Sequence, residues 1–315
     1  MKRKTIINIL KSIIILLIFF FIFRFLYANM DTLKNNEIHF NYSYLGISIL
    51  IYLLHIISNV IIWYFITKQN SCNIGFFETL RVRIYSDFGK YIPGKVFAYG
   101  ILFYSYDQKE VSKKKVMVCS LQELIIGTLA AIIIALVSIY FSKIEVLNKY
   151  NLVFLGLAII CIIAMHPKIL KYFTNKLLKL FKKEPVAITS TYGQMLLILL
   201  MFFVSWLIFG WAFYFFINSF YSYSITDYFF TTGAFAIAGL IGFIAIFAPA
   251  GLGVREGVLV FILNFIFPIA IASLISLISR VWMTLCEIIL FAIVFVINLF
   301  YKKLVLKNNK ISNEN

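Results

Sequence analysis

Charged side chains stand inside apolar stretches of this sequence, where an unpaired charge is costly and usually serves a function. Arg280 and Glu287 lie two helical turns apart on one expected helix, and Ser273, Ser276 and Thr284 extend the same polar face at spacings of three and four residues. Two roles suit such a stripe: an internal ion pair that ties helices together, or contacts with a substrate or an ion. We expect the second role and place Arg280 and Glu287 in a substrate-binding site.

A glycine-broken turn precedes a second charged pair, Arg255 and Glu256. Gly251 and Gly253 permit tight backbone geometry, and the start of the following helix offers free N–H groups to an anion. We expect an anionic head group to bind here, with Arg255 as its counter-ion and Glu256 balancing charge. The alternative is an ordinary cytoplasmic turn in which Arg255 serves only the membrane topology.

A single carboxylate, Glu123, stands early in another apolar run, with Ser120 and Gly127 on the same helical face. Two interpretations stay open. Glu123 neutralises Arg280 or Arg255 inside the bundle, or it lies near the cytoplasmic interface in contact with water. We include Glu123 among the expected substrate-binding residues.

A basic rim surrounds a Pro–Gly break in the first half of the chain, next to a helix expected to lie on the cytoplasmic interface. Such clusters attract anionic lipid with about 1 kcal/mol per Lys or Arg near the surface. We expect this rim to guide a head group into the protein, and passive attraction to the membrane surface is the alternative. The rim consists of Arg81, Arg83, Lys90 and Lys95 around Pro93 and Gly94, and we place Lys90, Pro93, Gly94 and Lys95 in the binding site.

The elements that carry these residues are expected to be membrane-spanning helices. Of the 315 residues, 62% are hydrophobic and 13% are charged, whereas a soluble domain carries about 25% charged residues. The bilayer is therefore the solvent, and a helix that crosses it needs about 20 apolar residues. We expect an all-α polytopic transmembrane helix bundle, a single integral membrane domain over residues 1–315 with a short cytoplasmic tail at 302–315. The spans, about eight in number, are expected at residues 6–28, 43–67, 115–140, 150–166, 194–217, 228–248, 252–267 and 269–300.

Lysine and arginine residues concentrate in alternate loops, and this pattern predicts the orientation. The basic segments are the N-terminus, residues 68–115, residues 168–183 and the tail, so we expect these segments and both termini in the cytoplasm. The net charge of +16 comes largely from these loops. We therefore expect no nucleic-acid partner.

Two interrupted segments, one in each half of the chain, depart from simple spans. In residues 89–106, Gly and Pro residues break the chain, and the apolar run Val96–Tyr106 is too short to cross. In residues 247–268, a second Pro–Gly break separates two apolar runs. Irregular backbone at membrane depth persists only where it is buried in protein or lines a wet cavity. We expect re-entrant or broken elements here, as in a transporter site.

Signatures of enzymes and metal sites are missing from the sequence. It contains no nucleophile–base pair, P-loop, G-x-G-x-x-G, H-E-x-x-H or C-x-x-C motif, and its three histidines are dispersed. We expect no catalytic residue, no metal and no cofactor.

Two stretches carry a resemblance to a known family. One is GKYIPGKV at residues 89–96, followed by a basic loop and SLQE at 120–123; the other is PAGLGVREG at 249–257. In order and spacing they resemble the lysylphosphatidylglycerol synthase transmembrane-region family, also called flippase-like membrane proteins, over nearly the whole chain. The resemblance implies an eight-helix bundle with re-entrant elements in the cytoplasmic (inner) membrane of a bacterium or an archaeon.

The resemblance also implies a function. In two-domain relatives, the multiple peptide resistance factors, this bundle translocates aminoacylated phosphatidylglycerol made by a C-terminal soluble synthase domain. This chain ends at Asn315, so we expect it to lack that domain and the lysyltransferase activity. We expect a lipid translocator or lipid-binding protein whose partners are membrane lipids with anionic head groups, either phospholipids or polyprenyl-linked lipids.

Two other functions stay open. An integral membrane enzyme that modifies a lipid or a lipid-linked glycan would use Glu123, Asp87 or Glu256 as acid or base. An accessory subunit of an envelope-glycan assembly complex would bind a glycosyltransferase. No pattern in the sequence indicates an oligomeric state.

Overall fold

The computed structural model describes residues 40–89, 96–142, 149, 151–164, 166–180, 190–245, 251 and 253–313. This described part is helical and contains no strand, which confirms the all-α fold. The expected first span, residues 6–28, and the rim residues Lys90, Pro93, Gly94 and Lys95 lie outside the described residues. The helices are α3 (Tyr42–Gln69), α4 (Phe76–Phe88), α5 (Val96–Asp107), α6 (Lys113–Tyr140), α8 (Asn151–Ala164), α9 (Pro167–Leu180), α10 (Tyr192–Asn218), the short 3-10 helix η2 (Ile225–Asp227), α11 (Tyr228–Ile244), α12 (Val254–Leu263) and α13 (Ile269–Asn313).

Apolar composition and capping residues together explain where the long helices form. In hydrocarbon, the backbone must satisfy its own hydrogen bonds, and a helix does so within one segment. Asn41 begins α3, because its side-chain oxygen accepts a hydrogen bond from the Tyr44 N–H at 3.1 Å. Thr191 and Gln194 form a reciprocal capping box that begins α10. These caps place the start of two spans at defined residues.

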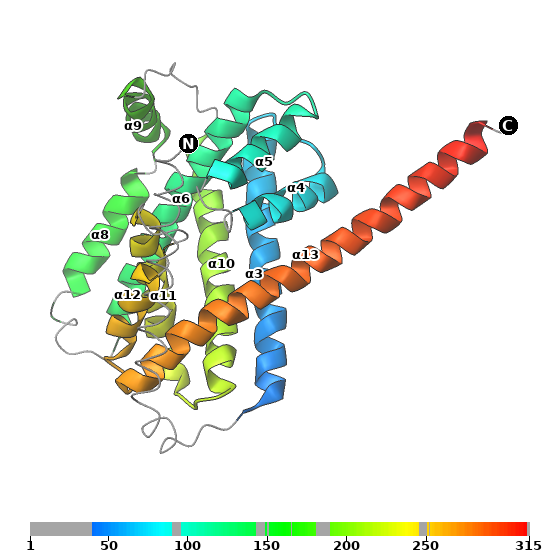
Figure 1. Ribbon diagram of the computed structural model, residues 1–315. Coiled ribbons are helices and arrows are strands. Elements are labelled where there is room, and N and C mark those ends of the chain that lie inside the picture. The colour runs from blue at the N-terminus through cyan, green and yellow to red at the C-terminus, as the bar shows by residue number, and fades with distance from the viewer. Residues whose placement is uncertain are drawn as a thin grey trace, which may run out of the picture.

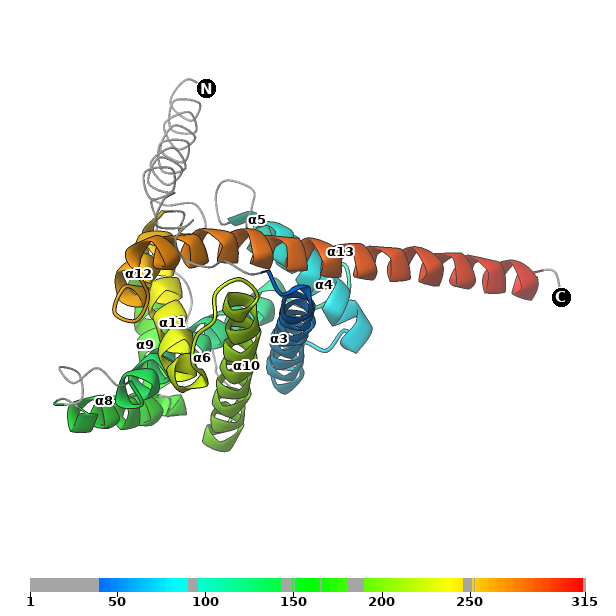
Figure 2. The same ribbon diagram turned by 90° about the horizontal axis from the view of Figure 1, so that it is seen from below.

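The long helices form a bundle that shorter helices cover at one end and on one side. α3 and α10 run side by side, and α6 packs against α11 (Figure 1). α4 and α5 pack together at one end of α3, while α12 packs against both α11 and α13. Seen from below, α13 crosses one side of the bundle, and its C-terminal part extends beyond the other helices (Figure 2).

Aromatic side chains dominate the packed interior. In one cluster, Phe216 of α10 stacks on Trp282 of α13 with ring centroids 4.6 Å apart, and Phe209 packs beside them. In the other, Trp63 of α3 donates a hydrogen bond to the Tyr106 hydroxyl of α5 at 2.9 Å. The second contact attaches the α4–α5 pair to the bundle and fixes its position near the site described below.

Five described segments are long and apolar enough to cross a membrane, which confirms a multi-pass membrane protein. Four expected spans, at residues 43–67, 115–140, 194–217 and 269–300, coincide with α3, α6, α10 and the apolar part of α13. The fifth is the η2–α11 segment, Ile225–Ile244, which ends before the expected limit at residue 248.

Two other expected spans are shorter helices. α8 has 14 residues and would reach only about 21 Å, less than a hydrocarbon core of roughly 30 Å. Within the expected span 252–267, α12 has 10 residues and ends before a turn that leads into α13. The second interrupted segment is therefore a break followed by a short helix, and the number eight stays a prediction.

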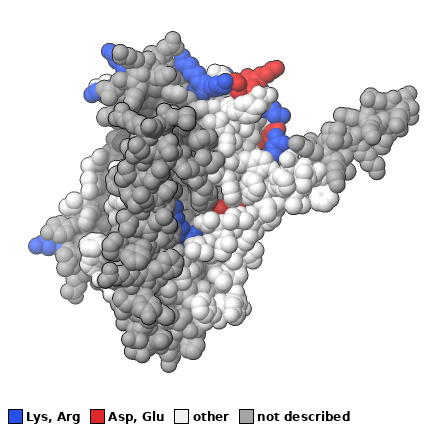
Figure 3. Space-filling view, viewed as in Figure 1, with Lys and Arg blue, Asp and Glu red and all other residues white. Residues whose placement is uncertain are grey.

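The outer surface agrees with a lipid environment. Charged side chains gather toward one end of the molecule (Figure 3). Large apolar side chains are exposed along the helices, for example Leu54 at 57%, Leu200 at 57% and Phe261 at 70% of their area. Exposure of so much apolar surface is unfavourable in water and expected where lipid surrounds the protein.

Candidate functional site

A cavity of about 380 Å³ lies where α4, α5 and α6 face α11, α12 and α13. We call it the charged cavity, because six ionisable side chains from four helices line it. Four of them, Glu123, Arg255, Arg280 and Glu287, are among the site residues expected from the sequence. The full set is Arg83, Asp87, Glu123, Arg255, Arg280 and Glu287.

One carboxylate stands between two arginines at the α12 side of the charged cavity. Glu256 is 5% exposed, and its Oε1 lies 2.8 Å from Arg280 Nη1 and 3.2 Å from Arg255 Nη2. Its other oxygen, Oε2, accepts a hydrogen bond from the Gly253 N–H at 2.7 Å and so caps α12. Ser276 of α13 donates to the Glu256 carbonyl at 3.0 Å. The three charges sum to one positive charge beside the cavity.

Glycines allow the broken segment to approach α11 closely enough to place Arg255. Gly251 and Gly253 have φ values of +69° and +79°, a region that other residues rarely adopt. A Cβ added to Gly251 would lie 2.8 Å from the Gly242 carbonyl oxygen, and one added to Gly242 would lie 2.9 Å from the Arg255 Cβ. Gly242 therefore has to be small for Arg255 to enter the cavity wall.

The Arg255 guanidinium is the least satisfied charge in this site. Its side chain is 13% exposed, its carbon lies 5.2 Å from the centre of the Phe235 ring, and Nη1 contacts the Met283 sulfur at 3.8 Å. The Arg255 Nε and Nη2 atoms are buried, and no described group accepts a hydrogen bond from either of them. Nη2 does contact Glu256 at 3.2 Å, but this contact is an ion pair without hydrogen-bond geometry. A buried donor without an acceptor is costly, so this group is suited to an anion in the cavity.

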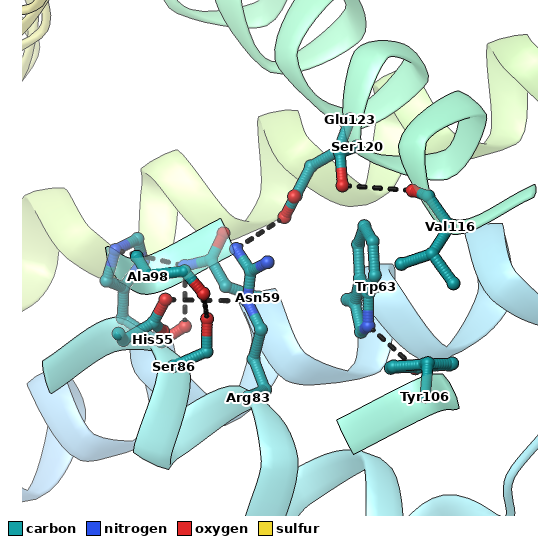
Figure 4. Close-up of polar contacts among 11 residues, drawn as sticks. His55, Asn59, Trp63, Arg83, Ser86, Ala98, Tyr106, Val116, Ser120 and Glu123 are labelled. Carbon is teal, nitrogen blue, oxygen red and sulfur yellow. Dashed lines mark hydrogen bonds and ion pairs between the residues drawn. The ribbon is translucent and has the colours of Figure 1, made fainter. Parts of the chain in front are cut away.

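Arg83 forms the opposite wall with carboxylates of its own. It reaches from α4 to Glu123 of α6, with Nη2 2.7 Å from Oε1, and Trp63 lies beside the guanidinium at 5.0 Å (Figure 4). Asp87, one turn further along α4, lies 3.6 Å from Arg83 Nε. Burial alone would lower the pKa of Arg83, but the carboxylates of Glu123 and Asp87 outweigh that effect and raise it. Arg83 therefore stays charged.

A smaller cavity of about 220 Å³ adjoins the charged cavity through Arg83, Asp87 and Glu287, which line both. His55 of α3 lies on its far side. The His55 Nδ1 is 2.9 Å from the Ser205 carbonyl oxygen, which requires a proton on Nδ1, and Nε2 accepts from the Asn59 amide at 3.2 Å (Figure 4). Both ring nitrogens are satisfied in the neutral form, so His55 ties α3 to α10.

The structure pairs the expected site residues differently from the sequence-based interpretation. Arg280 and Glu287 were expected to contact a substrate or an ion, with an internal ion pair as the alternative; the carboxylate that pairs with Arg280 is Glu256 of α12. Glu123 was predicted either to neutralise Arg280 or Arg255 or to be solvated, but it pairs with Arg83 and its side chain is 17% exposed. Glu287 still lines the same cavity.

Two residues of the basic rim, Arg81 and Arg83, lie in different environments. Arg81 forms an ion pair with Glu78 at 2.7 Å and a hydrogen bond to Asn298, outside the charged cavity. Arg83, two residues further along α4, points into the protein. Arg81, Arg83 and Asp87 were expected at the surface of an interfacial helix, so Arg83 and Asp87 were not predicted as cavity residues. The available signal was the position of Arg83 and Asp87, one turn apart on one helical face.

Metal ligands do not gather in the described part of the chain: no group of three or more His, Cys, Asp or Glu side chains there could hold a metal ion. The described cavity presents fixed charges on two sides, with Arg255 and Arg280 on one side and the carboxylates paired to Arg83 on the other.

Comparisons with known proteins identify the family. Residues 8–292 match the family model described as the lysylphosphatidylglycerol synthase TM region. Neither the comparison with curated proteins nor that with solved structures finds a match. The matched range contains the glycine break, both arginines beside Glu256 and the Arg83–Glu123 pair. Because the match covers most of the 315 residues, the chain belongs to the lysylphosphatidylglycerol synthase transmembrane-region family.

Proposed function

We propose that this protein binds a lipid with an anionic head group in the charged cavity and moves it between the leaflets of the membrane. The lipid would be a phospholipid or a polyprenyl-linked lipid. One observation carries the proposal: Arg255 lines the cavity, and two nitrogens of its buried guanidinium lack a hydrogen-bond acceptor among the described residues. A phosphate offers several strong acceptor oxygens to such a group.

The charge balance around Glu256 supports an anionic ligand at this wall. Arg280 makes the short contact with Glu256 at 2.8 Å, so the carboxylate is already neutralised before Arg255 is considered. Arg255 is then a surplus buried cation, and a buried cation without a partner is unstable. A phosphate held by Arg255 and Arg280 would supply the partner and would sit beside the start of α12, where the helix dipole also favours an anion.

The sequence contains no ATP-binding motif, so we propose that movement is passive or coupled to an ion gradient. The alternative of an integral membrane enzyme is less well supported. Its candidate acids and bases are all engaged, since Glu123 and Asp87 contact Arg83 and Glu256 contacts Arg280. A carboxylate held in an ion pair with a guanidinium is oriented for the recognition of charge, and each of these three is held in that way.

Lipid scrambling in vesicles tests the proposal. Purified protein is reconstituted with trace amounts of fluorescent phosphatidylglycerol, phosphatidylserine or a polyprenyl phosphate, and dithionite reports how fast the label leaves the inner leaflet. We expect wild-type protein to accelerate exchange of at least one of these lipids. If exchange of all of them is no faster than in protein-free vesicles, the translocation proposal is wrong.

Charge variants connect the activity to the site. Loss of one hydrogen bond to a charged group weakens binding by about 1.5–3 kcal/mol, or roughly 10- to 100-fold, so Arg255→Gln and Arg280→Gln should slow exchange strongly. Arg81→Gln is the matched control, because Arg81 pairs with Glu78 away from the cavity. If all three variants exchange lipid as fast as the wild type, Arg255 and Arg280 take no part in the mechanism.

A further inference from the structure

A third cavity, of about 280 Å³, adjoins the charged cavity between α6, α10 and α11. The two cavities share Tyr99, Glu123, Gly239 and Phe243 in their walls, so they adjoin along a common boundary. The first cavity is lined by six charged side chains, and the third has only one, Glu123, which lies at the shared boundary.

The third cavity is apolar and is shaped by small residues. Gly127 and Ala131 of α6 and Ala236 and Gly239 of α11 leave the space, and Phe202 and Trp206 of α10 form its floor. The Ser120 hydroxyl in this wall donates to the Val116 carbonyl of its own helix at 3.0 Å. Its hydrogen bond is therefore made within α6, and the wall presents hydrocarbon and aromatic surface to an occupant.

We propose that this cavity holds a hydrocarbon chain of the lipid whose head group lies in the charged cavity, and we name it the chain groove. The inference rests on the proposed function. An amphipathic molecule needs a charged compartment beside an apolar one, and these two cavities adjoin at Tyr99, Glu123, Gly239 and Phe243. The groove lies among α6, α10 and α11, three of the segments able to cross the membrane, so a chain would enter it from the hydrocarbon core.

The groove is expected to orient the chain rather than to supply affinity. Lipid tails already surround a chain in the bilayer, so its transfer into the groove gains little hydrophobic free energy. A hydrocarbon chain held beside α11 would instead keep the head group of the same lipid next to Arg255 and Arg280. Variants that fill the groove should therefore slow exchange of long-chain lipids and leave the binding of a water-soluble head-group analogue unchanged.

Gly239 gives a selective way to close the boundary. It lines both cavities, and a Cβ added there would meet no heavy atom within 4 Å among the described residues. Gly239→Leu therefore places a side chain into the open space without displacing a neighbour. Gly46→Leu is the matched control, because Gly46 lies in α3, has the same open surroundings and lines none of the three cavities.

Photo-crosslinking tests the groove directly. Phosphatidylglycerol with a diazirine in the middle of one acyl chain is irradiated in vesicles that contain the protein, and labelled peptides are located by mass spectrometry. We expect labelling within residues 120–131 or 236–243 in the wild type and in Gly46→Leu, and loss of most of it in Gly239→Leu. The same elution volume in detergent chromatography for all three proteins shows that they are folded.

The two proposals fail separately. Labelling spread evenly over lipid-facing residues such as Leu54 and Leu200, or labelling unchanged by Gly239→Leu, overturns the chain groove even if Arg255→Gln still abolishes exchange. Wild-type exchange equal to that of empty vesicles overturns translocation even if the groove is labelled. Labelling that depends on Gly239 together with exchange that depends on Arg255 supports both.

Discussion

Replacing Glu256 with Gln removes the only carboxylate that contacts both Arg255 and Arg280 among the described residues. Gln has nearly the same size, and its side-chain oxygen can still accept the Gly253 N–H bond that begins α12. The cap and the packing are therefore kept, and the substitution removes the negative charge together with the hydrogen bond from Arg280 to Oε1, where an amide NH2 group would face the guanidinium. Two guanidinium groups are left together in a partly buried site with no negative charge between them.

The expected loss of stability follows from burial. The side chains of Glu256, Arg255 and Arg280 are 6%, 13% and 18% exposed, so water screens them poorly. Removing one partner of a buried ion pair destabilises a protein by about 3–5 kcal/mol, which shifts the unfolding equilibrium more than roughly 100-fold. Arg280→Gln should be milder, because Arg255 remains beside Glu256 and neutralises it.

Reversible unfolding by SDS in mixed micelles, followed by tryptophan fluorescence, measures this difference. Three of the four tryptophans, Trp63, Trp206 and Trp282, are buried or half-buried in the described core, so the signal reports on the bundle. We expect Glu256→Gln to unfold at clearly lower SDS than Arg280→Gln, which in turn lies near the wild type. Equal midpoints for Glu256→Gln and the wild type would refute the argument that this carboxylate stabilises the site.

Three further outcomes are expected. Arg83→Gln should destabilise the protein by about 3 kcal/mol, and Arg83→Gln/Glu123→Gln should recover part of that loss in a double-mutant cycle; additive losses would show that the 2.7 Å pair is not coupled. Gly251→Ala should lower the free energy of unfolding by at least about 1–2 kcal/mol, because Gly251 has a positive φ. Gly257→Ala should leave the stability in SDS unchanged or raise it, because a Cβ there meets no described atom within 4 Å. Lys114→Cys should resist membrane-impermeant maleimide in intact cells, since the charge pattern predicts a cytoplasmic location for it; labelling there would reverse the predicted topology.

The sequence predicted those helices whose own residues form a long apolar run. Spans such as α3 and α10 are long apolar runs, and hydrocarbon leaves the backbone no other structure. The short helices were harder, because length and hydropathy alone do not show whether residues 150–166 cross the membrane. The observed end of α11 at Ile244 lies four residues before the expected limit, because the apolar run continues past the end of the helix and hydropathy alone does not show where a helix stops.

The site was predictable residue by residue but not pair by pair. Arg255, Arg280 and Glu287 were found because a charge in an apolar run is unusual. Spacing on one helix left open an ion pair between Arg280 and Glu287, but the 2.8 Å partner of Arg280 is Glu256, on another helix. Arg83 was missed as a cavity residue for the same reason, since its inward direction is set by Glu123, 40 positions away in sequence.

The number of arginines around Glu256 is the strongest argument for a ligand. One buried carboxylate is satisfied by one guanidinium, and Arg280 already provides it at 2.8 Å. Arg255 adds a second buried cation that shares the same Glu256 oxygen at 3.2 Å without hydrogen-bond geometry, and its other described neighbours, the Phe235 ring and the Met283 sulfur, are weaker partners than the water it has lost. The backbone also adopts positive φ at Gly251 and Gly253 to place it there. An anion in the adjoining cavity would supply the missing acceptors, so the instability of the empty site and its capacity to bind a head group have the same physical origin.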